Sequence, residues 1–314
     1  MTVLAISDGR AGNVRQARAL ADALAGVEAP HLRIDAAAPW RWLAPRRLPG
    51  TARGFGDAFP ATLRDPPAIA VGCGRQAALA TRVLRDAGAR AVQVLDPRID
   101  PRHWDCVVVP EHDRLRGGNV LTMLGSLNPI DDRWLDNVRT HHPRPQAWGD
   151  GRLTAVLLGG PTSAVPMWAN IVAAHAGILA GDAAVNGGHL AICTSPRTPR
   201  DWIPGLRQAI ADTHASLWTG EHDGPNPYPM LLAHAERIVC TPDSVNMLSE
   251  ACATTASVEW LPFPAQGRIA AFLESLQARE RARPLGSTQA TNRIPLRETA
   301  RITAEVSLRL RELR

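Results

Sequence analysis

The sequence predicts an α/β protein of two halves, each built on a parallel sheet that helices cover on both faces. Short apolar runs recur along the chain, as expected of strands buried in such a sheet. Most of these runs end in a turn containing Gly, Thr or Ser, after which apolar residues return at helical spacing. The series stops in a Pro- and Gly-rich stretch, residues 141–151, and then begins again. Two halves of similar size imply a cleft between them.

In the first half, apolar residues from Val14 to Leu24 and a run ending at Leu84 predict two helices, and Trp134 and Val138 mark a third, short one. Residues 36–66 are rich in Pro, Arg and Trp and are expected to form a long loop with short helices. The apolar runs expected to be strands are Val3–Ile6, His31–Ile34, Ala68–Val71, Ala91–Leu95, Cys106–Val109 and Val120–Leu124.

The second half repeats the pattern and ends in an amphipathic basic helix, Arg297–Leu313, with Ile302, Val306 and Leu310 on one face. A helix is also expected over Ile269–Leu276. The expected strands are Leu153–Leu158, Leu190–Cys193, Ser216–Trp218, Ile238–Cys240 and Val258–Leu261. We therefore predict domains at residues 1–145 and 151–282, followed by a linker and a helix that packs back on the body, residues 283–314.

Composition favours small anionic partners. The 35 basic and 30 acidic residues give a formal net charge of +5, which suits nucleotides, phosphosugars, acidic glycans or a membrane face. With one Tyr and four Phe, the sequence has no patch of aromatic residues interleaved with basic ones, so nucleic acid is not expected. Five scattered Cys without a C-x-x-C pair indicate reduced thiols. With no signal peptide and no apolar run long enough to span a bilayer, we expect a cytoplasmic protein; peripheral contact with the inner membrane face remains an alternative.

The stretch Ile238–Cys252 carries the clearest site pattern: an apolar strand, the turn Thr241-Pro242-Asp243-Ser244, and a helix that includes Met247. The free N–H groups at the start of a helix bind phosphate. Glu250, six residues after Ser244, is placed to accept hydrogen bonds from ribose hydroxyls. The alternative is an ordinary strand–turn–helix unit in which Glu250 is a solvated helix residue.

Three further strand-end loops of the second half suit a nucleotide. A Gly-Gly pair allows close approach of a phosphate, hydroxyls add donors, an arginine pairs bidentately with diphosphate, and a rigid turn holds the chain's one Tyr. Each feature has an ordinary alternative: a tight turn, a surface arginine or a loop. The residues are Gly159, Gly160, Thr162, Ser163, Thr194, Ser195, Arg197, Thr198, Asn226 and Tyr228.

Candidate bases lie in the first half. Asp8 follows the first strand, and Glu111, His112 and Asp113 follow another, although a polar surface turn is the more common explanation of this trio. Neither His141-His142 nor Glu221-His222-Asp223 has the spacing of a metal site, and a P-loop and a nucleophile elbow are both absent. We predict neither a metal nor a cofactor.

Motifs spread from Ser7 to about Pro262 resemble the mitochondrial fission "elongated mitochondria" family, which is more distantly similar to B-type glycosyltransferases such as the peptidoglycan N-acetylglucosaminyltransferase and the nucleotide-sugar 2-epimerases. The motifs are SDGRAGNVRQ at Ser7–Gln16, VPEHD at Val109–Asp113, GGPT at Gly159–Thr162, TSPRT at Thr194–Thr198, NPY at Asn226–Tyr228 and TPDSVNMLSEA at Thr241–Ala251.

The resemblance implies two Rossmann-like domains, with the donor nucleotide sugar held by the C-terminal one. Gly159-Gly160 and Ser244 would face its phosphates and Glu250 its ribose. The loop after the first strand would face the acceptor, through Gly9, Arg10, Gly12, Asn13 and Gln16. That loop lacks the histidine base of many such transferases, so Asp8 or the trio 111–113 must replace it. The E-x7-E pattern of many retaining members is absent around Glu250, which favours inversion.

We therefore expect a metal-independent glycosyltransferase that passes a sugar from a nucleotide-diphosphate donor to a hydroxyl, such as that of a glycan or a lipid-linked sugar. Two alternatives stay open. One is a non-catalytic adaptor of the mitochondrial-fission type, which binds a partner or a membrane through its basic face and C-terminal helix. The other is a nucleotide-sugar epimerase.

Overall fold

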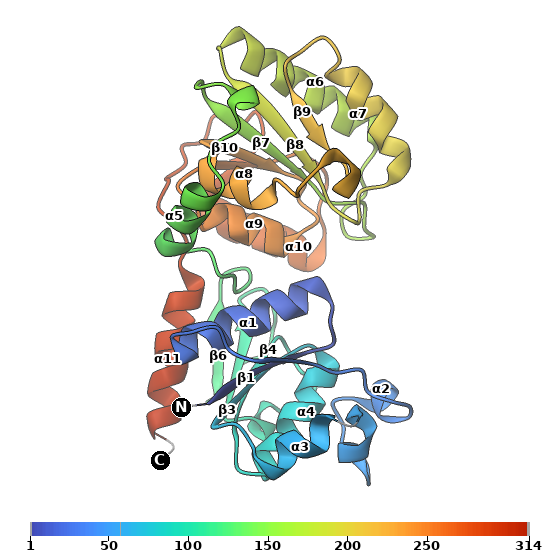
Figure 1. Cartoon of the computed structure of the whole chain (residues 1–314), viewed down its shortest axis with the longest axis vertical. Coiled ribbons are helices and arrows are strands. Elements are labelled where there is room, and N and C mark those ends of the chain that lie inside the picture. Colours follow the sequence, from blue (N-terminus) through green and yellow to red (C-terminus); the bar gives the residue numbers. More distant parts are fainter. Residues whose placement is uncertain (1, 57, 313–314) are drawn as a thin grey trace. The chain divides into compact units, whose positions relative to one another are not determined.

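The computed structural model describes residues 2–56 and 58–312, which fold into two compact α/β units (Figure 1). The first unit runs to Pro129 and takes in the C-terminal segment from Arg297, and the second is Ile130–Leu296. Every strand predicted from the sequence is present, with bounds shifted by a few residues. Both sheets are parallel, as predicted, and each has six strands; the sixth strand of the second sheet, Ala282–Pro284, was not predicted.

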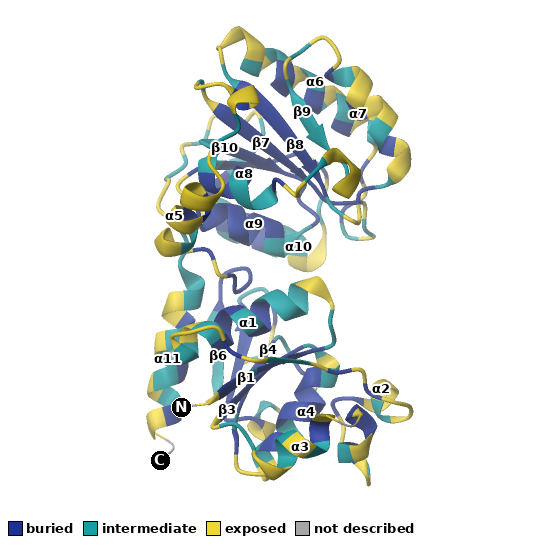
Figure 2. Ribbon diagram, viewed as in Figure 1, coloured by how far each residue is buried: buried dark blue, intermediate teal, exposed yellow. Residues whose placement is uncertain are grey.

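The first sheet has the strand order β2-β1-β3-β4-β5-β6. The strands β3 and β5 are buried along their whole length (Figure 2), because helices cover both faces of the sheet. Val3 of β1 pairs with Ile69 of β3, and this register continues to Ser7 and Cys73. The strands are β1 (Val3–Ser7), β2 (His31–Arg33), β3 (Ile69–Cys73), β4 (Arg90–Val94), β5 (Cys106–Pro110) and β6 (Val120–Met123).

Two helices far apart in sequence lie side by side in the first unit. The apolar face of α11 (Glu298–Glu312), formed by Ile302, Val306 and Leu310, shares a core cluster with residues of α1 (Ala11–Ala25). The carboxylate of Glu298 accepts a hydrogen bond from Leu124 N at 2.7 Å. The C-terminal helix is thus a structural part of the first unit. The other helices there are α2 (Trp40–Leu43), α3 (Ala58–Arg64) and α4 (Arg75–Asp86), with the 3₁₀ turns η1 (Thr51–Phe55) and η2 (Pro101–His103).

The second sheet has the order β12-β11-β10-β7-β8-β9. Both β7 and β8 consist of buried residues only. The strands are β7 (Leu153–Leu158), β8 (His189–Thr194), β9 (Ser216–Trp218), β10 (Arg237–Cys240), β11 (Ser257–Trp260) and β12 (Ala282–Pro284). Its helices are α5 (Asp132–His141), α6 (Ala169–Val185), α7 (Ile203–Ala209), α8 (Tyr228–His234), α9 (Val245–Cys252) and α10 (Gly267–Ala278), with the 3₁₀ turns η3 (Gln146–Trp148), η4 (Arg200–Trp202) and η5 (Glu221–Asp223).

The unit boundary differs from the predicted one. The break between units falls at Pro129–Ile130, because α5 packs against α8 and Arg139 Nε donates to Ala233 O at 2.9 Å. The predicted linker over residues 283–294 also belongs to the second unit. It begins in β12, which pairs with β11, and Arg283 forms ion pairs with the buried Glu259. Proline and glycine punctuation at residues 141–151 marked a loop within the unit, not its edge.

Each sheet has a point at which the strand order reverses. In the first it lies between β1 and β3, and in the second between β7 and β10. Ligands of doubly wound sheets bind outside the carboxyl ends of the strands at such points. Predicted site loops follow β1 in the first unit and β7 and β10 in the second.

Candidate functional site

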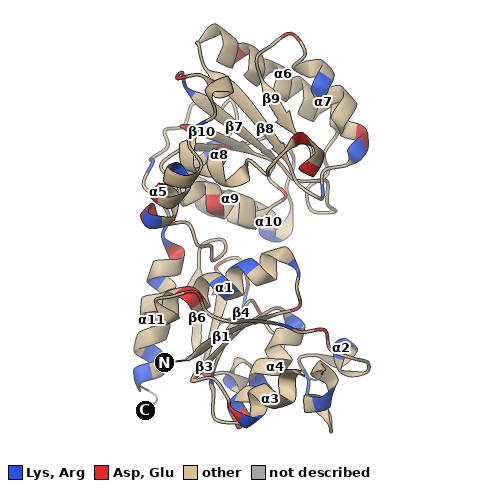
Figure 3. Ribbon diagram, viewed as in Figure 1, with Lys and Arg blue, Asp and Glu red and all other residues tan. Residues whose placement is uncertain are grey.

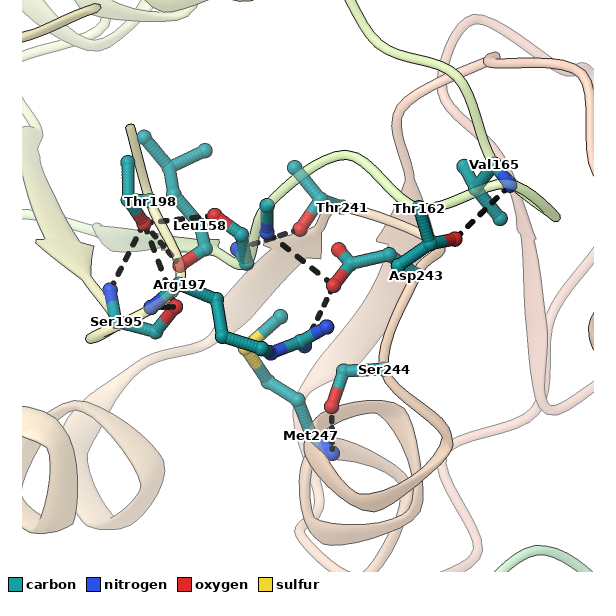
Figure 4. A network of polar contacts seen from close by, with 12 residues as sticks. Leu158, Thr162, Val165, Ser195, Arg197, Thr198, Thr241, Asp243, Ser244 and Met247 are labelled. Carbon is teal, nitrogen blue, oxygen red and sulfur yellow. Dashed lines mark hydrogen bonds and ion pairs between the residues drawn. The ribbon is translucent and has the colours of Figure 1, made fainter. Parts of the chain in front are cut away.

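The candidate donor site lies at the carboxyl edge of the second sheet. Four adjacent strands, β10, β7, β8 and β9, end there, and each is followed by one of the loops predicted from the sequence. Figure 4 shows three of these loops tied together by polar contacts. The fold thus brings most of the predicted nucleotide-binding residues to one edge, although they are spread over ninety residues of chain.

Asp243 is the centre of this network. Its side chain is completely buried and forms an ion pair with Arg197, with Nη2 to Oδ2 at 2.5 Å. The same oxygen accepts a hydrogen bond from Gly160 N at 3.2 Å. A single carboxylate therefore joins the loops after β7, β8 and β10. The other oxygen, Oδ1, is buried and has no hydrogen-bond partner among the residues that the structure describes.

The Gly159-Gly160 pair is required by packing inside the protein. A Cβ on Gly159 would overlap the carboxylate of Asp243, and one on Gly160 would overlap the carbonyl oxygen of Arg197. Gly159 N donates to Thr241 Oγ1 at 2.7 Å. The sequence analysis assigned these glycines to phosphate approach; the structure shows a second reason for them, the close contact of three loops.

The loop after β8 is held by Thr198. Its buried hydroxyl donates to Leu158 O and Gly159 O, at 3.0 and 2.7 Å, and accepts from Ser195 N. Ser195 Oγ in turn accepts from Arg197 N at 3.2 Å. The predicted donors Thr194 and Thr198 are both buried. Arg197 keeps about half of its side chain exposed (48%), so its guanidinium joins Asp243 to solvent.

Helix α9 begins as predicted. Ser244 is its N-cap, and its hydroxyl accepts from Met247 N at 3.3 Å. Thr162 has a comparable local role, because its hydroxyl accepts from Val165 N at 3.0 Å, whereas Ser163 is exposed. The positive end of the α9 dipole therefore lies beside the Arg197–Asp243 pair.

Glu250 is not a solvated helix residue: it is only 3% exposed. Its Oε2 accepts a hydrogen bond from the hydroxyl of Tyr228, at the start of α8, at 2.6 Å. Asn226 orients this turn, since its Oδ1 accepts from Tyr228 N at 2.9 Å. The sequence analysis proposed Tyr228 and Glu250 for one site without predicting that they are in contact.

In the first unit, Asp8 lies at the reversal point between β1 and β3. Its Oδ1 accepts from Asn13 Nδ2 at 2.9 Å and from Arg10 N at 3.2 Å. Asn13 Oδ1 lies 3.7 Å from the thiol of Cys73, at the end of β3. A Cβ on Gly74, whose φ is +91°, would meet Asn13 Nδ2 at 2.5 Å. The two loops after β1 and β3 are thus fitted to each other around Asn13.

The other predicted acceptor-side residues differ in accessibility. Gly9, with φ +82°, packs against Arg33, while Gly12 and Arg10 lie in the turn that starts α1, where Arg10 has an exposed side chain. Gln16 is buried, and its amide nitrogen reaches the carbonyl of Gly12 at 3.5 Å. Gln16 therefore contributes to packing beneath the loop.

The structure does not bring the two candidate bases together. Glu111, His112 and Asp113 follow β5, which is separated from β1 by β3 and β4. Three strand spacings place the trio about 14 Å from Asp8 along the sheet edge. Asp113 is buried, and Arg116 donates to the backbone carbonyls of Glu111 and Asp113. Only one of these two groups can act on a given acceptor hydroxyl.

The described residues hold no candidate metal cluster, and their thiols are buried. Across residues 2–56 and 58–312, no group of three or more His, Cys, Asp or Glu side chains is arranged to hold a metal ion. All five cysteines are buried and reduced. Burial raises the pKa of Cys106 and Cys193 to about 12 and that of Cys252 to about 11, so these thiols are poor nucleophiles.

No helix among the described residues is long and apolar enough to cross a membrane.

Thr241 was missed as a site residue, although it stands inside the predicted turn. A hydroxyl directly after a buried strand can accept a hydrogen bond from the backbone of the adjacent strand's loop. Here the Thr241 hydroxyl accepts one from Gly159 N. Cys73 and Gly74 belong to a strand-end loop, residues 72–76, that the sequence also indicates as a ligand loop, but the sequence gives neither residue an individual role. Their role depends on which strand lies next to β1, and the sequence does not specify that order.

Comparison with known proteins identifies relatives along nearly the whole chain. The family model described as mitochondrial fission ELM1 matches residues 11–310. The Mitochondrial fission protein ELM1 of Arabidopsis thaliana is 27% identical over 250 residues, 69% of this chain. The chain aligns with 56% of the length of that relative.

Solved structures share the fold at low sequence identity. Rice (O. sativa) Os79, crystallised with UDP, superposes with a TM-score of 0.57 at 12% identity, over 99% of this chain and 92% of that one. The UDP-GlcNAc 2-epimerase of Methanocaldococcus jannaschii, in complex with UDP-GlcNAc and UDP, gives 0.54 at 12% identity, over 98% and 100%. MurG of Acinetobacter baumannii gives 0.53 at 14%, over 98% and 99%. The fold is therefore that of the B-type glycosyltransferases, as expected.

Proposed function

The chain belongs to the mitochondrial fission ELM1 family, and from this premise we propose that it is a glycosyltransferase that uses a nucleotide-diphosphate sugar. The second unit would bind the donor, and the loop after β1 in the first unit would bind a hydroxyl acceptor. The reaction would need no metal ion and would invert the configuration of the sugar.

One observation carries the proposal: the loops after β7, β8 and β10 meet at the reversal point of the second sheet around Arg197 and the N-terminus of α9. A guanidinium has five donors in a fixed fork, so Arg197 can keep its bond to Asp243 and still pair with a diphosphate. Its half-exposed side chain and the α9 dipole both favour an anion here. The three similar structures add support, because two of them hold UDP.

The buried Glu250 would bind the ribose. A carboxylate accepts several hydrogen bonds, and one of those of Glu250 comes from the Tyr228 hydroxyl. Ribose would replace this hydroxyl or bind beside it. The neighbouring Asn226 turn would then shape the pocket for the base.

Transfer would proceed by direct displacement. The acceptor oxygen forms a bond to the anomeric carbon, the bond to the diphosphate breaks, and the bonding pair leaves with the nucleoside diphosphate. The acceptor proton passes to a carboxylate. We assign this role to Asp8, since Asp8 lies at the reversal point of the first sheet, whereas the trio 111–113 follows β5, three strands from β1. Arg197 and the α9 N–H groups would stabilise the charge that develops on the leaving group.

The test is to incubate the full chain with UDP-, GDP-, ADP- and CMP-activated sugars and measure nucleotide release with and without pooled glycan and lipid-linked acceptors. We expect acceptor-dependent release from one donor. Arg197→Lys should lower this rate about 100-fold, the effect of losing one transition-state donor. Arg200→Ala, a nearby exposed arginine in η4, should not. An equal loss in both variants would contradict the assigned role of Arg197.

A non-catalytic adaptor is the second candidate, favoured by the name of the Arabidopsis relative. The two candidates differ in Asp8→Asn. If the protein is an enzyme, this variant should lose sugar transfer but still bind the nucleotide. If it is an adaptor, neither the wild type nor the variant should transfer a sugar or bind a nucleotide. Conversion of the sugar without an acceptor would instead indicate an epimerase, the activity named for one of the similar structures.

A further inference from the structure

Helix α6 carries two apolar faces, and only one of them is covered by its own unit. Val172, Ala176, Leu179 and Ala180 are buried in the core of the second unit. On the opposite side, Ile171, Ile178 and Val185 are 40%, 63% and 87% exposed. Figure 2 shows exposed segments along α6, and Figure 3 shows that it is almost free of charge. Large apolar side chains in such a row mark a contact surface.

The exposed residues follow a seven-residue repeat. The large β-branched residues Ile171, Ile178 and Val185 are spaced by seven, and the small residues Ala174 and Gly181 lie between them at the d positions of a heptad. We call these five residues the outer seam. His175 and Asp182, at successive e positions, flank it. A repeat of 3.5 residues is the pattern of a helix that pairs with another helix.

We propose that the outer seam pairs with the same seam of a second copy of this chain, in an antiparallel two-fold arrangement. Such pairing, centred between Ile178 and Gly181, places Ile178 against the partner's Gly181 and Val185 against the partner's Ala174. Ile178 and Val185 then each meet a small residue, as close helix packing requires, while Ile171 lies at the end of the pair. Residues at e face the partner's e positions in antiparallel pairs, so His175 lies near the partner's Asp182. In a parallel pair, large residues would instead face large ones and small residues would face small ones.

The charges of α6 favour a second copy over a lipid surface. Helices that lie on membranes have Lys or Arg along the polar face, and residues 169–185 contain neither. The self-complementary placement of His175 and Asp182 is of no use on a membrane. At about 25 Å long, a pair of such helices forms an interface below the usual size, so the association should be weak and depend on concentration.

Cysteine cross-linking tests the arrangement directly. Ala174→Cys and Val185→Cys each introduce a single surface thiol into a chain whose own thiols are buried. In the proposed pair, residue 174 lies opposite the partner's 185, while 174 and the partner's 174 are about 16 Å apart along the axis, too far for a disulfide. A mixture of the two variants should form cross-linked dimers under mild oxidation, and neither variant alone should do so. Dimers from each variant alone would overturn the proposal.

Sedimentation velocity over a range of concentrations gives an independent test. Ile178→Glu should weaken self-association at least tenfold, whereas the matched control Ile294→Glu, at a 72% exposed isoleucine outside the seam, should not change it. The wild-type chain remaining monomeric at high concentration would overturn the proposal. The proposal would also be overturned if the chain does not self-associate and Ile178→Glu instead abolishes its binding to anionic vesicles. That result would identify the outer seam as a lipid-binding surface.

Discussion

The two units have the same architecture but differ in how their carboxyl edges are built. In the second unit a buried carboxylate, Asp243, ties three loops into one rigid edge. In the first unit Asp8 is joined mainly to its own loop, through Asn13 and the backbone of Arg10. Its ion pair with Arg10 is long, at 3.6 Å, and the Arg10 side chain is 85% exposed.

This difference matches the two roles that we propose. A diphosphate requires donors fixed in place before it binds, because preorganised donors cost no rearrangement during the reaction. The three-loop edge of the second unit supplies such donors. An acceptor hydroxyl requires only a base and a shaped loop, which can vary with the acceptor. The comparison can be tested by changing matched residues in the two units.

The largest difference is expected between Arg197→Ala and Arg10→Ala. Removing Arg197 leaves the Asp243 carboxylate buried without its ion pair, which should lower the free energy of unfolding by about 3 kcal/mol. Removing Arg10 breaks an exposed pair and should cost less than about 0.5 kcal/mol. Urea denaturation followed by circular dichroism measures both values. Equal effects would mean that the buried pair does not stabilise the second unit.

Gly160→Ala is expected to cost about 2–3 kcal/mol, since its Cβ would overlap the backbone of Arg197 and force two loops apart. Gly118→Ala is the control, because its Cβ would meet nothing within 4 Å. Thermal unfolding of the two variants makes the comparison. A Gly160→Ala protein as stable as the wild type would show that the three loops are not tightly fitted.

In the first unit, Asn13→Ala should cost about 1 kcal/mol, the usual value of a side-chain hydrogen bond, because it removes the bond to Asp8. Asn13→Asp should cost more, since it places a second carboxylate beside Asp8. The same denaturation experiment gives both values. A greater loss in Asn13→Ala than in Arg197→Ala would reverse the comparison between the edges.

The smallest effect concerns pH and involves one histidine in each unit. Burial, and then the charge of Arg18, lower the pKa of His31; burial, and then Arg144, lower that of His189. The unfolded chain therefore binds more protons than the folded one. The stability that the two neutral histidines contribute is present above their unfolded pKa of about 6.5 and is lost as the pH falls below it. For each histidine the free energy of unfolding falls by at most about 1.4 kcal/mol per pH unit. The double variant His31→Gln/His189→Gln should show a flatter pH dependence between 7.5 and 5.5. An unchanged slope would contradict this account.

Local patterns predicted the strands and the site loops because both arise from neighbouring residues. The turn from Thr241 to Ser244 is an example: a buried strand, a proline and an N-cap serine are adjacent in sequence. For the second unit, the sequence predicted only that the loops lie at the same edge of the sheet, because each follows the carboxyl end of a parallel strand. The specific bonds between them, such as Arg197 to Asp243, depend on strand order and loop conformation.

Three features of the structure could not be derived from the sequence for the same physical reason, namely that contacts between distant residues decide them. Asp8 and the trio 111–113 are separated by the order of the strands. The carboxylate of Glu250 is buried because Tyr228 packs onto it from α8. The boundary between the units lies earlier in the chain than predicted, because α5 packs against α8, which follows it by almost one hundred residues.

The most direct test of the central claim is calorimetric titration of the full chain with UDP, GDP, CMP and ADP. We predict that one nucleotide binds with a micromolar dissociation constant and that Glu250→Gln weakens it by about 10- to 100-fold, the loss of a hydrogen bond to a charged group. Glu274→Gln, at an exposed carboxylate on α10, should bind like the wild type. If the folded wild-type chain binds none of the four nucleotides, or if both variants bind equally well, the donor site is not where we place it.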